Sequence, residues 1–260
     1  MGTSKSYSGS GGKVGKAIRE EVGEWIESHK PGSERPGAGG EGNEPLSQPF
    51  QNVIGLLRPR RSGGGDGPGG GGAGGGASGG GGRGGGPQRS AARSASTAGR
   101  AAAAAYAYRT GDAAALETMG LSYAELSGLG SPTQVARRIV EFVCGPRGAS
   151  TIDDTEQRLI AAEVAEWVVS QQAEGHEATP EEIAKHAIAN IVVDTLLTET
   201  WELIGKSDNA VTVENEIREA AENWVSGHAS IEINGATEND FSKAIEAGIE
   251  SLRRIITGDS

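Results

Sequence analysis

Residues 179–205, TPEEIAKHAIANIVVDTLLTETWELIG, decide the fold of this protein. The segment begins with Thr179, Pro180 and Glu182, a helix start in which the threonine and glutamate side chains satisfy amides that have no partner inside the helix. Apolar residues then lie around most of the helix circumference: Ile188, Ile191, Val192, Val193, Leu196 and Leu197. A helix that is apolar on nearly all sides is buried. We therefore expect a helix that is closed by Gly205 and lies at the centre of the protein.

Further helical patterns flank this segment on both sides. Cap and stop signals predict them at about 90–109, 112–119, 131–144, 153–172, 210–225 and 238–256, with a short helix from Ser122. Asn234 and Gly235 predict a turn between the last two helices. No stretch outside the linker described below alternates convincingly between apolar and polar residues. The predicted fold class is therefore all-α, with a helical domain over 90–260.

A glycine tract separates this domain from the start of the chain. Residues 63–86 are three quarters glycine, and glycine loses more backbone freedom on folding than any other residue. No Gly-X-Y period with proline runs through the tract, which argues against a collagen helix. We predict a disordered Gly/Pro-rich linker over 31–89, with a root-mean-square span on the order of 45 Å. An apolar island at 50–57 inside it is a candidate docking segment.

The N-terminal arm consists of a flexible tip, 1–12, and one amphipathic helix, 13–30. Four apolar residues of this helix fall at steps of four, four and three and make one stripe: Val14, Ile18, Val22 and Trp25. An isolated helix of this length is marginal in water, so the stripe needs a partner surface. We assign these four residues to partner binding. Packing of the helix against the protein's own body is the alternative, because Ile217 and Trp224 repeat the same pattern.

Charge is distributed unevenly along the chain. The formal net charge is -11, yet 151–260 carries 23 acidic against 7 basic residues, whereas 56–110 carries eight arginines against one acid. The favoured interpretation is that both segments form solvated surface and partly attract each other. The alternative is a set of phosphate contacts made by Arg58, Arg60, Arg61, Arg83, Arg89 and Arg93. Because no aromatic residues for base stacking are interleaved, nucleic-acid binding is the less favoured interpretation.

The residues that support catalysis or metal binding form no recognisable arrangement. Cys144 is the only cysteine, which excludes an intrachain disulfide and a cysteine zinc site. The histidines sit at no metal-ligand spacing: His29, His176, His186 and His228. The acidic pairs at 153–154 and 181–182 lie at helix starts, where carboxylates favour the helix dipole. We predict a protein that is not an enzyme and has no catalytic residues, metal or cofactor.

Hydropathy predicts neither secretion nor a membrane span. The N-terminus lacks the apolar region of a signal peptide. No run of about 18 apolar residues occurs, which is the length that a membrane-crossing helix needs. The expected location is the cytoplasm.

The chemically distinctive group in the tip is an α-amine. Glycine at position two is the usual condition for removal of Met1, which would expose the amine of Gly2. An α-amine has a pKa of about 7.7–8.0, against about 10.4 for lysine, so a sizeable fraction is nucleophilic near neutral pH. The opening also fits the loose myristoylation pattern through Ser6. Small residues after Gly2 can thread into a narrow channel and form a recognition tail: Thr3, Ser4, Ser6 and Gly9.

Several short motifs resemble the QatB family, the partner protein of four-component Qat anti-phage defence systems of bacteria. They cover the first ten residues and roughly 91–205: the opening MGTSKSYSG, Phe142-Val143-Cys144, Gly148, Thr151-Ile152-Asp153-Asp154, Thr179-Pro180 and Glu202-Leu203-Ile204-Gly205. The linker differs, being glycine-rich where that family's tends to be proline-rich. The arm helix over 13–30 is not a feature of that family.

This resemblance implies three partners: an ATPase, a QueC-like deazaguanine enzyme and a TatD-like nuclease. QueC-type chemistry activates a deazaguanine carboxylate with ATP and captures it with an amine. The main hypothesis is that Gly2 is the acceptor and that the helical body docks the other components. One rival is a nucleic-acid-binding adaptor that uses the arginine-bearing linker. Another is a purely structural adaptor that binds through the Trp25 helix.

Overall fold

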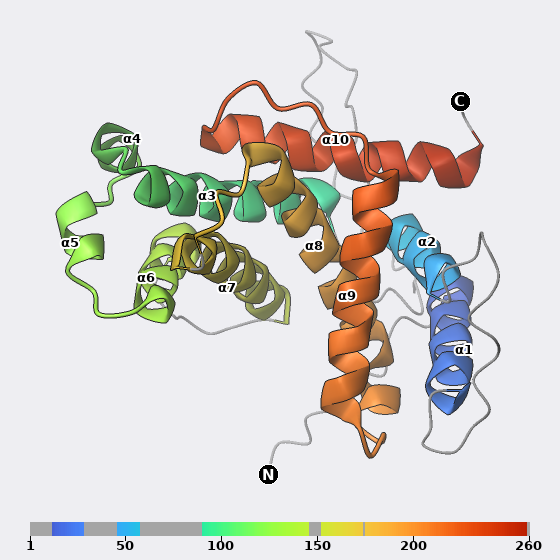
Figure 1. The fold of residues 1–260 in the computed structure, drawn as a ribbon. Coiled ribbons are helices and arrows are strands. Elements are labelled where there is room, and N and C mark those ends of the chain that lie inside the picture. The colour runs from blue at the N-terminus through green and yellow to red at the C-terminus, as the bar shows by residue number, and fades with distance from the viewer. Residues whose placement is uncertain (1–11, 29–45, 58–89, 146–151, 174, 259–260) are drawn as a thin grey trace, which may run out of the picture.

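The structure consists of helices and the connections between them (Figure 1). The computed structural model describes residues 12–28, 46–57, 90–145, 152–173 and 175–258. The helices in these ranges are α1 (Lys13–Ser28), α2 (Ser47–Leu56), α3 (Ala91–Thr110), α4 (Ala113–Thr118), α5 (Tyr123–Ser127), α6 (Pro132–Cys144), α7 (Ile152–Ala173), α8 (Pro180–Ile204), α9 (Ala210–His228) and α10 (Glu238–Thr257). No strand occurs in the described ranges, which confirms the predicted all-α class.

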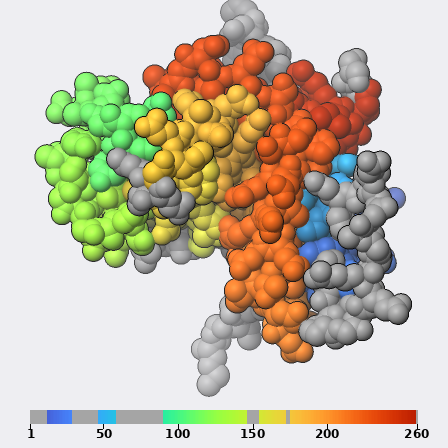
Figure 2. Space-filling view, in the orientation of Figure 1, coloured from blue at the N-terminus to red at the C-terminus, as the bar shows by residue number. Residues whose placement is uncertain are grey.

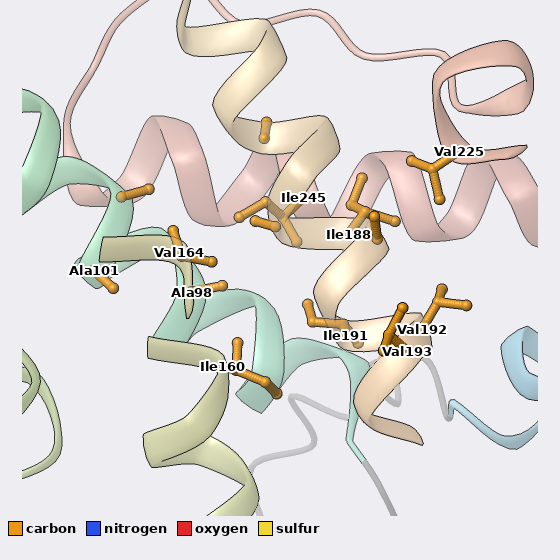
Figure 3. Packing of buried hydrophobic residues seen from close by; sticks show 14 of the residues in the cluster. Ala98, Ala101, Ile160, Val164, Ile188, Ile191, Val192, Val193, Val225 and Ile245 are labelled. Atoms are coloured by element: carbon orange, nitrogen blue, oxygen red, sulfur yellow. The ribbon is translucent and has the colours of Figure 1, made fainter. Parts of the chain in front are cut away.

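α8 is the central helix, as its sequence predicts. It is buried over most of its 25 residues, and α1, α2, α3, α7, α9 and α10 all pack against it. Figure 3 shows part of this cluster, with side chains from α8 beside others from four helices: Ala98 and Ala101 of α3, Ile160 and Val164 of α7, Val225 of α9 and Ile245 of α10. The predicted cap is present: Thr179 Oγ1 accepts from Glu182 N at 3.2 Å, and Glu182 Oε2 accepts from Thr179 N at 2.6 Å.

The alanine-rich helix α3 lets its neighbours approach its backbone. The alanines at 101–105 are all buried, and α3 packs most extensively against α7 and α10. At Gly99 a Cβ atom would lie 2.7 Å from the backbone nitrogen of Ser242 and 2.8 Å from its Cα. α10 therefore touches the α3 backbone directly, at a point where only glycine fits.

The remaining helices lie on two sides of this centre. In Figure 1, α4–α7 lie to the left of α8, α1 and α2 lie to its right, and α3 and α10 run across its upper part. The space-filling view shows α9 in front and α4–α6 as a projection on the left (Figure 2). The first part of the chain is thus placed on the opposite side from α4–α6.

The prediction of a linker throughout 31–89 is wrong at 46–57. This stretch forms α2, and the apolar island predicted at 50–57 belongs to the core: Leu46, Phe50, Val53, Ile54 and Leu57 are almost completely buried. These residues recur at steps of three and four, so one face of a helix can bury them together. α2 packs against α1, α8 and α10. The rest of 31–89 lies outside the described residues.

The turn predicted at Asn234 and Gly235 is also wrong. The connection at 229–236 runs without a turn or bend, and Gly235 does not adopt a positive φ angle. The flanking residues Ala229 (φ -76°, ψ 120°) and Thr237 (φ -78°, ψ 164°) are extended as well. Its side chains alternate between inward and exposed positions from Ala229 to Asn234, with Ile231 packed inward, so a short stretch of period two does occur outside the linker.

Replacing Gly99 by alanine should lower the free energy of unfolding by about 1–3 kcal/mol, because the added methyl group must displace the α10 backbone at Ser242. The matched control is Gly23→Ala in α1, where the new Cβ would make an ordinary contact of 3.9 Å with Leu203 Cδ1. That substitution should raise stability by about 0.5–1 kcal/mol through helix propensity. Urea unfolding followed by circular dichroism measures both variants, and a stabilising Gly99→Ala would contradict the close approach.

Candidate functional site

The predicted modification site lies at the very start of the chain, outside the described residues. This holds for the acceptor Gly2 and for its recognition tail, Thr3, Ser4, Ser6 and Gly9. The first described residue is Gly12, which is exposed and directly precedes α1. The structure therefore shows the anchor from which this segment departs.

The apolar stripe of α1 is buried within its own chain. Ile18 and Val22 are completely buried and Trp25 is 8% exposed, because α1 packs against α2 and α8. The assignment of Ile18, Val22 and Trp25 to partner binding is therefore wrong. The stripe packs against the apolar face of α8 in the same chain, which is the alternative given for this helix in the sequence analysis above. Only Val14 of the four stays substantially exposed, at 38%.

A buried ion pair accompanies the apolar contacts between α1 and α8. Arg19 Nη1 lies 3.5 Å from Glu199 Oε2, and the Glu199 side chain is 1% exposed. A carboxylate this deeply buried is costly unless a charge and hydrogen bonds compensate it. Because the cation comes from α1, this contact specifies which helix covers this part of α8.

α2 holds α1 in place from the other side. Asn52 Nδ2 donates to both carboxylate oxygens of Glu21, at 3.2 and 2.9 Å. Phe50 reaches the core, where its ring centroid lies 5.7 Å from that of Trp224 in α9. We call α1 and α2 together the docked arm. Because the docked arm packs against α8 and α10, the point at which residues 1–11 join the folded protein is fixed on the body.

The His186 side chain of α8 connects this helix to α7 and α9. Its ring stacks on Trp167 of α7 at 4.2 Å, its Nδ1 lies 3.1 Å from Glu222 Oε1 of α9, and its Nε2 lies 3.0 Å from Asn190 Nδ2. Since the amide nitrogen of Asn190 can only donate, Nε2 accepts and Nδ1 carries the proton that Glu222 receives as a hydrogen bond. Both ring nitrogens are engaged, which leaves the imidazole no free nitrogen to act as a base.

The single cysteine shows no sign of activation. Cys144 is half-buried at the end of α6, and burial raises the pKa of its thiol despite the nearby Arg158. A thiol with a raised pKa stays protonated and is a poor nucleophile. Within the described ranges no group of three or more His, Cys, Asp or Glu side chains could hold a metal ion. None of the helices described has the length and apolar character that crossing a membrane requires.

One hollow lies along α3, and the arginine that lines it is bound by groups of the protein itself. This hollow has a volume of about 940 Å³, and Arg100, Phe142 and Lys243 are among its lining residues. The Arg100 guanidinium lies 5.4 Å from the centroid of the Phe142 ring, 3.3 Å from Glu238 Oε1 and 3.3 Å from the backbone oxygen of Val143. Arg100 therefore ties α3 to α6 and α10. Of the arginines predicted for phosphate contact, Arg93 is exposed on α3 and the others lie outside the described residues.

Comparison with known proteins identifies no relative. The chain matches no protein-family model, no curated protein and no solved structure. The function therefore has to be argued from the residues and from their placement.

Arg19→Ala should lower the free energy of unfolding by about 2–4 kcal/mol, because it removes the cation that lies against the buried Glu199. Lys16→Ala is the matched control on the same helix, since Lys16 forms an exposed pair with Glu20 at 3.4 Å. Its loss should cost no more than about 0.5 kcal/mol. Urea unfolding compares the two variants, and equal decreases in the free energy of unfolding would contradict the larger contribution expected of the buried pair.

Glu222 should make folding stability depend on pH in acid. The hydrogen bond from His186 lowers the pKa of Glu222 in the folded protein, against an opposing effect of burial. A carboxylate with a lowered pKa stabilises the fold above its unfolded pKa of about 4.3, and that contribution is lost as pH falls through the folded pKa. The stability difference between the wild type and Glu222→Gln should therefore shrink from about pH 5 to pH 3. Glu219→Gln, at an exposed position of the same helix, is the control, and a difference that stays constant with pH would contradict the assignment.

Proposed function

We propose that this chain is a non-catalytic component of a bacterial anti-phage defence complex, and that Gly2 accepts a modification from a QueC-like deazaguanine enzyme. Removal of Met1 would expose the α-amine. Its free-base form would attack the activated carboxyl carbon of the deazaguanine, the activating group would leave, and loss of a proton from the nitrogen would complete an amide. In this proposal the protein is the substrate of the partner enzyme.

The observation that carries this proposal is the fixed anchor of the segment before Gly12. Ile18 and Val22 are completely buried against the body, and the Arg19–Glu199 pair holds the same helix to α8. The body therefore presents the start of the chain from one defined place. A modifying enzyme that docks on the body can then meet the amine at high effective concentration.

Docking of the arm changes which stretch of chain sets the reach of Gly2 from the body. If the long linker separated the tip from the body, its span on the order of 45 Å would set the reach. With α1 docked, only the ten peptide units between Gly2 and Gly12 contribute, and these extend at most about 35 Å. A partner active site must therefore lie within about 35 Å of the beginning of α1.

The rival function, nucleic-acid binding, gains no support from the described arginines. Arg100 and Arg109 bind within the chain: Arg100 to Glu238, and Arg109 to the backbone oxygen of Ala178 at 2.5 Å. The acidic excess of 151–260 would also repel a polyanion. A purely structural adaptor that binds through the Trp25 stripe conflicts with the burial of that stripe.

Intact-mass analysis after co-expression with the QueC-like partner tests the proposal. We expect an N-terminal peptide that lacks Met1 and carries one deazaguanine, joined through its carboxyl carbon to the Gly2 nitrogen as an amide. Lys5→Arg should keep the adduct, because it removes only a side-chain amine, whereas Gly2→Val should reduce it at least about tenfold by adding bulk at the acceptor. An unmodified Gly2 in the presence of active partners would contradict the proposal.

A pair of matched deletions tests the role of the anchor. Deleting 5–10 shortens the reach of Gly2 to about 15 Å and should abolish the adduct. Deleting six residues from the glycine tract, 69–74, should leave the adduct unchanged, because that tract does not lie between Gly2 and the body. The opposite result would mean that the long linker sets the reach.

A further inference from the structure

Asn234 is the only asparagine of the chain that is followed by glycine. The side-chain carbon of an asparagine can be attacked by the backbone nitrogen of the next residue, because the two atoms close a five-membered ring. A Cβ atom on that next residue crowds its nitrogen, so glycine, which has none, allows the closest approach. The pair that the sequence marked as a turn is therefore also a pair of groups that can react with each other.

The structure leaves both groups of this pair accessible. Asn234 is exposed in the connection between α9 and α10, which Figure 1 shows running back along α10. The connection has no turn at this point, so the Gly235 amide is not engaged in the hydrogen bond of a turn. In the part of the chain that the structure describes, this amide has no hydrogen-bond partner at all.

Ring closure needs a rotation about one bond of the main chain. The Gly235 nitrogen must turn about the Cα–C bond of Asn234 until it lies over Cβ, within about 3–3.5 Å of Cγ. This rotation breaks no hydrogen bond of the Gly235 amide within the described ranges. Thr237 N donates to Asp240 Oδ2 at 3.1 Å and so holds the chain beyond. Gly235 absorbs the change of direction through its wide range of backbone angles.

The other exposed asparagines of α9 and α10 lack these conditions. Asn215, Asn223 and Asn239 each precede a residue that has a Cβ atom. The amides after Asn215 and Asn223 belong to the hydrogen-bond ladder of α9. The amide after Asn239 is that of Asp240, and it donates to Thr237 Oγ1 at 3.3 Å. Rotation at any of these sites would break a hydrogen bond.

Negative charge near Asn234 does not set this site apart. Glu232 lies on the same side of the extended segment, and the Asp240 carboxylate lies against Gly235. Both charges oppose the loss of a proton from the Gly235 amide. Asn239 directly precedes Asp240, so the same opposition acts there. The sites therefore differ in access and in freedom to rotate.

We propose that Asn234 and Gly235 form a self-modification site, at which Asn234 loses ammonia without an enzyme. The Gly235 nitrogen bonds to Cγ of Asn234, the Cγ–Nδ2 bond breaks, and the proton of the Gly235 amide leaves with Nδ2 as ammonia. Water then opens the resulting succinimide. Opening at Cγ gives aspartate, and opening at the main-chain carbon gives isoaspartate, in which the backbone runs through Cγ.

Either product changes the charge of the surface beside α10. Asn234 lines a hollow of about 550 Å³ there, together with three carboxylates and two cations: Glu232, Asp240, Glu250, Lys243 and Arg254. The reaction adds a fourth carboxylate to this lining. Because the ammonia is lost to solution, the change is not reversed, and the modified fraction rises with the age of the molecule.

Incubation of the full-length protein at neutral pH, followed by mass spectrometry of tryptic peptides at intervals, tests the proposal. The peptide 219–243 contains Asn223, Asn234 and Asn239, so fragmentation compares the three positions within one molecule. We expect position 234 to gain the mass that accompanies replacement of an amide NH₂ by OH. Its rate should be at least about tenfold higher than the rate at 239. An isoaspartyl methyltransferase, used as a reagent, should methylate the isoaspartate product.

Matched variants separate this reaction from general breakdown of the protein. Asn234→Gln keeps a neutral amide at the same exposed position, but its attack closes a larger ring. Modification at 234 should therefore fall at least about tenfold. Asn239→Gln, at the neighbouring exposed asparagine, should leave the rate at 234 unchanged. Asn234→Asp should elute with the aspartate product of the aged protein on anion exchange.

A synthetic peptide with the sequence of 229–238 gives the rate of the same pair outside the fold. The folded protein should react at no less than about a tenth of that rate, because the fold leaves the Gly235 amide free to rotate. A lower ratio would mean that the fold protects Asn234, and it would overturn the proposal. Equal rates at 234 and 239, or an unchanged rate in Asn234→Gln, would overturn it as well.

Discussion

α8 is apolar around most of its circumference, so the fold has to cover it on every side. α7 and α9, its neighbours along the chain, cover two sides, and α3 and α10 cover a third. The remaining face needs helices from elsewhere in the chain, and α1 and α2 supply them. Leaving that face in water would expose apolar surface at about 25 cal/mol per Å², which is why a helix far away in sequence is recruited to it.

The buried Glu199 adds a specific requirement to this general one. An apolar helix could cover the open face of α8, but a carboxylate 1% exposed also needs a cation close by. Arg19 satisfies it from α1, and Asn52 of α2 then binds Glu21 of α1. The hydrophobic effect requires that some helix cover this face of α8, and the charge of Glu199 selects α1 as that helix.

Docking of the arm gives the glycine tract another role. The tract joins α2 to α3, and both helices pack against α8 and α10, so it closes a loop within one core. The entropic cost of such a loop grows slowly, by about 0.6 kcal/mol for each doubling of length, which explains how a long glycine-rich insertion is tolerated there. The reach of the N-terminus is then set by the short stretch before Gly12.

The sequence by itself determined the helices and the central place of α8. Caps such as Thr179 with Glu182, and apolar spacing within 20 residues, are local signals that do not depend on the rest of the fold. Tertiary structure alone decided where the stripe of Ile18, Val22 and Trp25 packs, that 46–57 joins the core, and that 229–236 extends along α10. These depend on surfaces that come together only when distant segments fold: an amphipathic stripe reveals that it needs a partner, but the partner's identity is a property of the assembled core. Ser230 to Asn234 did carry the alternation of a strand, yet five residues are too few to separate that pattern from a loop until the α10 surface lies beneath them.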